Sequence, residues 1–376
     1  MERGECDQAF VAGANLLLAS HHYRYFCSIG ALSRSGRSHT FDHRADGYIP
    51  GESVAAVLLK PLSEAERAGD RIYGIVKGSA VSHGGYTPSI TAPSVDGEVK
   101  VLLKAWADAG IHPASLGYIE AHGTGTKLGD PVEVSALQKA FRQYEGTVAK
   151  HNVRIPIGSA KAHLGHAEGA AGIVGLIKAM LSMNKGLIPA MPRFEALNPY
   201  IKLEGGPFYI NVEPEEWKVE GDGLRRAGVS SFGFGGAYAH AVLEEYRGAV
   251  GIKNEALKME GPFIVPLSAK NEARLGEVVL NLAKYLDDPL KGEHFNLSDL
   301  AYTLQVGREA MECRLALVVH EVEELKVQLA SYRKGNRKDF LIGDVKKDQS
   351  DFLLEGEAGR SYIETAIKKK ESQSLA

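Results

Sequence analysis

Three glycine-rich turns, each placed directly after a short apolar run, constrain the fold of this 376-residue chain most strongly. The runs cover residues 116–121, 155–159 and 226–230, and the turns cover residues 122–126, 161–166 and 231–236. Short apolar runs bounded by glycine predict buried strands. Helical patterns follow the first two turns, at 130–141 and 167–183, and this alternation predicts an α/β fold with a buried sheet. Because ligands bind beyond the carboxyl ends of strands in such sheets, we expect the turns to converge on one site.

The rest of residues 1–247 fits the same architecture. Further strands are predicted at residues 7–18, 52–60, 71–82, 208–212 and 239–244, and helices at 62–68 and 99–109. The strand at 7–18 is expected to be buried. One face of the helix at 99–109 carries the apolar residues Val101, Leu102, Ala105 and Trp106. That face is predicted to meet the core.

A second, smaller α/β unit is predicted after a polar, glycine-bearing linker at residues 248–261. Its strands are expected at 263–267 and 314–319, and its helices at 273–286, 297–304 and 321–332. We therefore divide the chain into residues 1–247, residues 262–340 and a polar tail at 341–376.

Composition excludes several classes of function. The net charge of −3 gives no electrostatic footprint for nucleic acid or an anionic membrane. No apolar run approaches the ~20 residues of a membrane span, and no signal peptide opens the chain. Three scattered cysteines are too few for a disulfide framework, so a cytoplasmic location is expected. The glycine spacing also fits neither dinucleotide nor P-loop binding.

Two histidines in the glycine-rich turns are the strongest candidates for chemistry. His122 follows the first strand, and His166 stands between the second strand and its helix. Two imidazoles in one site suggest handling of a proton or of a developing negative charge. A helix N-terminus beside His166 would favour its neutral, hydrogen-bond-donating form. The alternative for His122 is a turn histidine bonded to a backbone carbonyl.

Other polar residues of the same turns leave alternatives open. Lys161 could pair with Glu168 and orient the site, or it could be a solvated surface lysine. A metal site built from His163, His166 and Glu168 lacks the usual helical ligand spacing. Asp130, which precedes Pro131, is expected to be the N-cap of its helix.

None of the three cysteines fits the position of a nucleophile. Cys6 precedes a predicted strand, Cys27 lies in an aromatic-rich irregular stretch, and Cys313 belongs to the second unit. A nucleophilic cysteine is expected at a strand-to-helix elbow, where a helix N-terminus lowers the thiol pKa.

Taken together, these motifs resemble the C-terminal two-thirds of a ketosynthase domain of a modular polyketide synthase, in the β-ketoacyl synthase family. The resemblance extends from residue 1 to about 245, and residues 262–340 resemble the small linker domain that follows such ketosynthases. No acyltransferase-like segment follows, which fits synthases whose acyltransferase acts in trans. The matching stretches are residues 3–7 with 12–15, 41–42 with 45–48, 120–126 with 129–131, 157–172 and 230–236.

The resemblance implies a thiolase-like α-β-α-β-α fold, incomplete at its N-terminus, in a homodimer. It implies decarboxylative Claisen condensation, in which a cysteine receives an acyl chain and malonyl carrier protein supplies the enolate. The partner would be an acyl carrier protein, whose phosphopantetheine arm enters the site; no directly bound cofactor and no metal are implied.

Residue roles also follow from the resemblance. His122 and His166 match the histidines that assist decarboxylation, and Lys161 matches the lysine that organises them. Glu168, if it pairs with Lys161, is expected to support the site. Thr124 and Thr126 match threonines that contact the phosphopantetheine arm. Phe234 matches the residue that completes the oxyanion hole and gates the acyl pocket.

The chain departs from the family pattern in several places. The nucleophilic cysteine would stand upstream of Met1, so the ketosynthase is expected to be split, truncated or a fragment, and inactive as this chain alone. Ala237-Tyr238, Ala162-His163 and Pro50 replace the usual residues, and Tyr238 puts the pocket shape in question. The alternative function is an inactive structural or docking remnant of a synthase module, and an unrelated α/β binding protein is a third.

Overall fold

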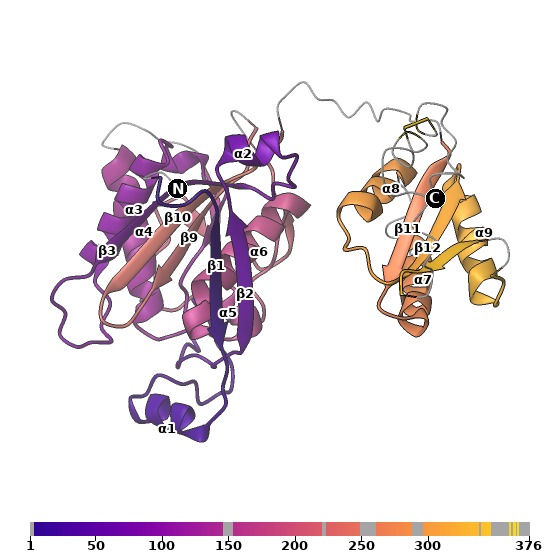
Figure 1. Cartoon of the computed structure of the whole chain (residues 1–376). Coiled ribbons are helices and arrows are strands. Elements are labelled where there is room, and N and C mark those ends of the chain that lie inside the picture. Colours follow the sequence, from indigo (N-terminus) through magenta and orange to yellow (C-terminus); the bar gives the residue numbers. More distant parts are fainter. Residues whose placement is uncertain are drawn as a thin grey trace. The chain divides into compact units, whose positions relative to one another are not determined.

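The computed structural model divides into two compact units, Met1–Gly248 and Ala249–Ala376 (Figure 1). Within the described ranges, no helix is both long and apolar enough to cross a membrane. The structure describes residues 4–145, 153–219, 223–248, 261–287, 296–337 and 340–346, together with residues 361, 364, 365 and 367.

A six-stranded sheet forms the centre of the first unit. Its strands run in the order β3 (Ile75–His83), β10 (Ala237–Glu244), β9 (Arg226–Phe232), β4 (Tyr118–Glu120), β5 (Ile155–Gly158) and β7 (Phe208–Tyr209). Strands β9, β4, β5 and β7 are parallel, and β10 is antiparallel to both of its neighbours. The carboxyl ends of β4, β5 and β9 therefore lie at one edge of the sheet. The three glycine-rich turns leave the sheet from this edge, as predicted.

Helices cover both faces of this sheet (Figure 1). Helices α3 (Val95–Asp108) and α4 (Gly129–Glu145) pack on one face, and α6 (Ala171–Lys185) packs on the other. Successive strand residues face opposite sides, so Ile119 joins the α3–α4 core whereas Tyr118 packs with Met183 of α6. The predicted apolar face of α3 is confirmed, because its four residues are at most 1% exposed.

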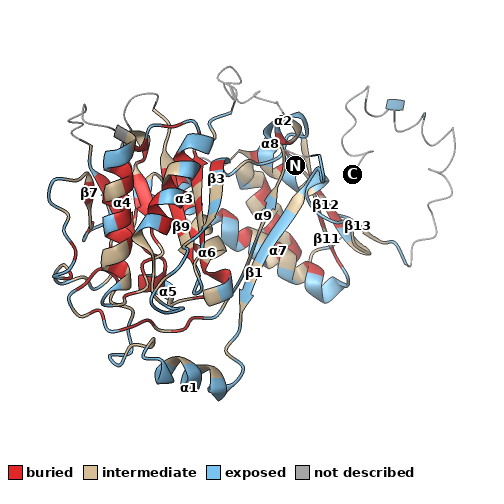
Figure 2. Cartoon of the chain, turned by 90° about the vertical axis from the view of Figure 1, so that its left-hand side faces the viewer, coloured by how far each residue is buried: buried red, intermediate tan, exposed pale blue. Residues whose placement is uncertain are grey.

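A two-stranded antiparallel sheet stands beside this core. It pairs β1 (Ala9–Asn15) with β2 (Ser53–Leu59), and α1 (Ser20–Ser28) and α2 (Leu62–Arg67) follow the two strands. The prediction of a buried strand here is wrong, because Phe10 is 75% exposed and Leu18 is 85% exposed. No residue of β1 is fully buried (Figure 2). Apolar composition predicts that a strand has a face suited to burial, but it does not say which element covers that face. None of the described residues covers the side chain of Phe10.

Short elements complete the first unit. They are α5 (Lys161–Leu164), β6 (Leu187–Ile188), β8 (Glu215–Glu216) and the 3₁₀ turns Pro113–Ser115 and Glu168–Ala170. Helix α6 begins at Ala171, four residues later than predicted, because the 3₁₀ turn precedes it.

The second unit has its own sheet and core. Its strands β11 (Phe263–Ala269), β12 (Cys313–Val319) and β13 (Leu341–Asp344) are antiparallel in that order, with α7 (Glu272–Leu286), α8 (Leu297–Val306) and α9 (Val322–Arg333). Strand β13 lies beyond the boundary expected at residue 340, because its residues pair with β12. Nearly all of the predicted tail after residue 346 lies outside the described residues.

Candidate active site

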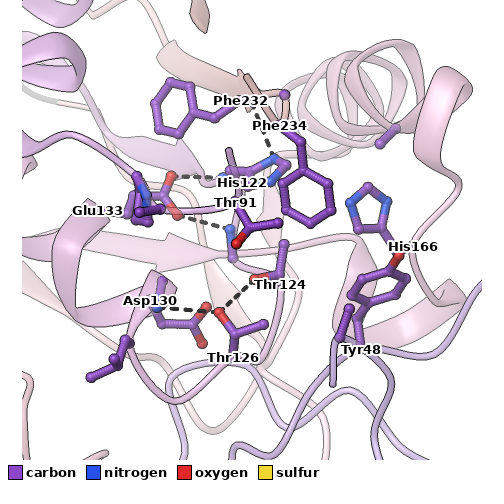
Figure 3. A pocket seen from close by; sticks show the side chains of 18 of the residues that line it. Tyr48, Thr91, His122, Thr124, Thr126, Asp130, Glu133, His166, Phe232 and Phe234 are labelled. Atoms are coloured by element: carbon purple, nitrogen blue, oxygen red, sulfur yellow. Dashed lines mark hydrogen bonds between the residues drawn. The ribbon is translucent and has the colours of Figure 1, made fainter. Parts of the chain in front are cut away.

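A cavity of ≈ 670 Å³ lies at the carboxyl ends of β4, β5 and β9 (Figure 3). Most of the predicted site residues line it, namely His122, Thr124, Thr126, His166, Glu168 and Phe234. Lys161 is buried at 6% exposure and is not among the lining residues. The three glycine-rich turns therefore converge on one cavity.

His122 is held as a neutral hydrogen-bond donor. Its Nδ1 accepts the Phe232 N–H at 3.2 Å, which assigns the imidazole proton to Nε2. Burial holds the pKa of His122 well below its usual range, and the charge of Lys161 lowers it further. The alternative of a turn histidine bonded to a backbone carbonyl is wrong, because among the described residues this ring accepts from an amide and bonds no carbonyl.

His166 is held in the same way. Its Nδ1 accepts the Glu168 N–H at 2.9 Å, which again assigns the proton to Nε2. Burial, followed by the charge of Lys161, lowers the pKa of His166 to about 3. Burial is thus the main cause of the neutral form that was predicted from a helix dipole. The ring centroids of His122 and His166 are 5.6 Å apart, and both rings line the same cavity.

Lys161 lies behind the histidines, among carboxylates. Burial lowers its pKa, while the negative charges of Glu120, Glu133 and Asp130 oppose this shift. The predicted pairing with Glu168 is wrong. The Glu168 carboxylate is instead 2.9 Å from His22 Nε2 and accepts the Tyr48 hydroxyl at 3.4 Å. The charge of Lys161 lowers the pKa of both imidazoles.

Two acidic residues in the first turns of α4, Asp130 and Glu133, hold the loop around His122, a role not predicted from the sequence. The two oxygens of Glu133 accept the N–H groups of His122 at 2.7 Å and Gly123 at 2.8 Å. The Asp130 carboxylate accepts the N–H groups of Phe41 and Gly125 at 2.7 and 3.0 Å.

The N-cap prediction for Asp130 is therefore wrong. Helix α4 begins at Gly129, and the Gly129 N–H donates to Thr126 Oγ1 at 3.2 Å. The sequence did contain a signal for this role. Two acidic residues follow a glycine-rich turn, and the backbone N–H groups of such a turn need acceptors.

Lys178 is a second lysine that sequence reasoning missed. Its ammonium donates to Glu120 at 2.8 Å and to the Tyr118 hydroxyl at 2.7 Å. Glu120 also accepts the Ala160 N–H, which joins β4 to the start of the second turn. A lysine in the middle of a helix carries no local sequence signal.

The remaining predicted residues, Thr124, Thr126 and Phe234, also line the cavity. Thr124 and Thr126 bond to each other through their hydroxyls at 3.1 Å. Phe234 is 55% exposed, and the Gly235 N–H ties its loop to the Ile90 carbonyl at 2.8 Å. In the described part of the chain, no acceptor bonds the Phe234 N–H.

No cysteine is among the residues that the structure describes around this cavity. Cys6 and Cys27 are exposed, and Cys313 belongs to the second unit. Cys27 lies in helix α1 rather than in an irregular stretch. Across the described ranges, no three His, Cys, Asp or Glu residues come together as a metal-binding group.

The arrangement suits stabilisation of a negatively charged oxygen. Two neutral Nε2–H groups that line one buried cavity are preorganised donors, and donors of this kind typically contribute about 3 kcal/mol each to a developing oxyanion. Their low pKa values keep both rings neutral at neutral pH, and the backbone N–H donated to each Nδ1 leaves the remaining proton on Nε2.

Models of three protein-domain families match the sequence. Residues 1–65 match "Beta-ketoacyl synthase, N-terminal domain", residues 73–195 match "Beta-ketoacyl synthase, C-terminal domain", and residues 266–336 match "RhiE-like, KS-MAT linker domain". His122, Lys161 and His166 all fall inside the C-terminal match.

Curated and solved relatives agree with these models. Polyketide synthase PksN of Bacillus subtilis is 42% identical over 97% of this chain, but the match spans only 7% of PksN. A ketosynthase from module 6 of the bacillaene synthase of Bacillus subtilis superposes with a TM-score of 0.89 at 35% identity, over 100% of this chain and 64% of that one. A Streptomyces albus oxazolomycin ketosynthase domain superposes with a TM-score of 0.81 at 36% identity, over 91% of this chain and 57% of that one. The chain therefore has the thiolase-like α/β fold and belongs to the β-ketoacyl synthase family, as part of a polyketide synthase ketosynthase with its linker domain.

Proposed function

We propose that this chain supplies the part of a ketosynthase active site that contains the two histidines and carries out decarboxylative condensation. His122 and His166 would be the catalytic residues, and Lys161 would position them. The observation that carries the proposal is the pair of Nε2–H donors that line one cavity while backbone amides occupy both Nδ1 atoms. The nucleophilic cysteine would come from a segment outside these 376 residues. This fits the lack of any thiol among the described residues of the cavity wall.

In the proposed reaction a malonyl thioester on an acyl carrier protein enters the cavity. The bond to its carboxylate breaks, CO2 leaves, and the electron pair forms an enolate whose oxygen accepts from the two histidines. The enolate carbon then attacks the acyl-cysteine carbonyl, and the cysteine leaves as a thiolate. Thr124 and Thr126 would contact the phosphopantetheine arm, and the Phe234 N–H would stabilise the tetrahedral oxyanion.

Lys161 would act as a positioning residue through its charge. Its ammonium disfavours a second positive charge on either imidazole, so both stay neutral donors. Glu168 would hold the segment around His166. Its backbone N–H donates to Nδ1 of His166, and its carboxylate is hydrogen-bonded to Nε2 of His22.

The test is reconstitution of the chain with a cysteine-bearing N-terminal ketosynthase segment, in the dimeric form expected of the family. His122→Ala should leave acyl transfer to the cysteine intact and lower malonyl decarboxylation at least 100-fold. His163→Ala is the matched control, because His163 is exposed and does not line this cavity. If no cysteine-bearing partner restores condensation, the chain is an inactive remnant of a synthase module, and the proposal is overturned.

A further inference from the structure

A buried carboxyl in the cavity wall plays no part in the proposed chemistry. Glu98 lies in the first turn of α3, is 1% exposed, and lines the same cavity as His122. Its Oε2 has no hydrogen-bond partner among the described residues. Buried polar side chains almost always have a partner, so this one indicates a group that a ligand could satisfy.

Aromatic rings connect Glu98 to the reacting end of the cavity. The His122 ring lies 5.7 Å from the Phe232 ring, and Phe232 lies 5.1 Å from Tyr238. The Tyr238 ring packs against Gly97, next to Glu98, so closely that a Cβ at Gly97 would lie 2.7 Å from it. An acyl chain bound in the cavity beside His122 could therefore follow these rings toward Glu98.

A backbone hydrogen bond holds the Tyr238 side chain in the cavity wall, and Tyr238 makes no hydrogen bond to Oε2 of Glu98. The Tyr238 hydroxyl accepts the Ser94 N–H at 2.9 Å, and Ser94 caps α3 by accepting the Gly97 N–H. Tyr238 is 3% exposed, so the bulky residue forms part of the cavity wall without filling it.

The Glu98 carboxyl is un-ionised at neutral pH. Burial, together with the negative charge of Glu133, raises its pKa to about 9. A protonated carboxyl carries one O–H donor as well as an acceptor oxygen. It can therefore donate to an oxygen atom of a ligand without bringing a net charge into the cavity.

We propose that Glu98 determines substrate specificity by donating its carboxyl O–H to a hydroxyl or keto oxygen on the acyl chain. The proposal rests on the proposed function, in which the cavity receives an acyl chain on a phosphopantetheine arm. A purely hydrocarbon chain would leave the buried donor unpaired, so the enzyme discriminates against it. Sites that hydrogen-bond a substrate hydroxyl reject the analogue that lacks it far more strongly than apolar pockets do.

The test compares the binding of two non-transferable amide analogues, 3-hydroxybutyryl-pantetheine amide and butyryl-pantetheine amide, to the chain reconstituted with a cysteine-bearing N-terminal ketosynthase segment, by calorimetry. Wild type should bind the hydroxylated analogue about tenfold more tightly, the effect of roughly one hydrogen bond. Glu98→Leu should bring the ratio close to one without weakening butyryl binding. Glu98→Gln keeps an N–H donor and should retain part of the preference.

Asp96→Asn is the matched control, because Asp96 is two residues away on the same helix and its side chain is 85% exposed. It should leave the ratio unchanged. Equal binding of both analogues to wild type, or a preference that survives Glu98→Leu, overturns the proposal while pantetheine binding stands. Tighter binding of a 3-aminobutyryl analogue overturns it in favour of an ionised Glu98. If neither analogue binds, both this proposal and the proposed function fail.

Discussion

The buried Glu98 carboxyl resists ionisation, and this should make the free energy of unfolding depend on pH. Its pKa of about 9 in the folded chain exceeds the usual value of 4.5, so the folded state binds more protons between these two values. Its contribution to stability is therefore present below about pH 4.5 and is lost as pH rises toward 9. From pH 6 to 8, Glu98→Gln should gain stability relative to wild type by about 1 kcal/mol per pH unit. Urea unfolding at three pH values checks this, and parallel pH profiles would contradict it.

Glu133 tests a different property at the residue scale, the fixing of the His122 loop. Its carboxylate accepts two backbone N–H groups, those of His122 and Gly123. Glu133→Gln replaces one acceptor oxygen with an NH2 group that faces a donor, so one amide loses its partner. We expect a loss of about 2 kcal/mol in the free energy of unfolding. Chemical denaturation at pH 7 measures it, with Glu204→Gln at an exposed position of the same unit as the control. An equal effect of both changes would contradict this account.

At the scale of elements, the first glycine-rich turn has little room. Gly125 has φ = +78°, and a Cβ there would lie 3.1 Å from His39 N. Gly125→Ala should lower the free energy of unfolding by about 2 kcal/mol or more, because left-handed strain and crowding combine. Gly110 also has a positive φ, of +61°, but open space around its Cβ position. Gly110→Ala should therefore cost only the strain, and thermal denaturation that ranks the two variants equally would remove the crowding argument.

Local signals predicted the elements well, because strand ends, glycine turns and the face of α3 depend on neighbouring residues. The same signals predicted that His122 and His166 lie in one site, because parallel strands end at the same edge of a sheet. They failed where partners are distant in sequence. Asp130 bonds the amide of Phe41, 89 residues away, and Glu168 meets His22, 146 residues away. The residues next to Asp130 and Glu168 in the sequence do not indicate these distant partners. The exposure of β1 likewise depends on which other segments cover it.

At the scale of the whole molecule, each unit has its own core, and we propose that the two unfold separately. Leu325 is fully buried among the side chains of α7, α9 and β12. Leu325→Ala should destabilise the second unit by about 3 kcal/mol through a cavity and lost apolar burial. Scanning calorimetry should show a lower midpoint temperature for the unfolding of the second unit and an unchanged midpoint for the first. Movement of both transitions by the same amount would show that the units unfold together.

Stabilisation of an oxyanion in this cavity requires both His122 and His166 to be neutral Nε2–H donors. Nitrogen NMR of the chain with 15N-labelled histidine reports this directly, with signals assigned through His122→Gln and His166→Gln. We predict that both rings carry their proton on Nε2 and remain neutral from pH 8 down to pH 5. Titration of either ring near its ordinary pKa of 6.5, or a proton on Nδ1, would contradict the account.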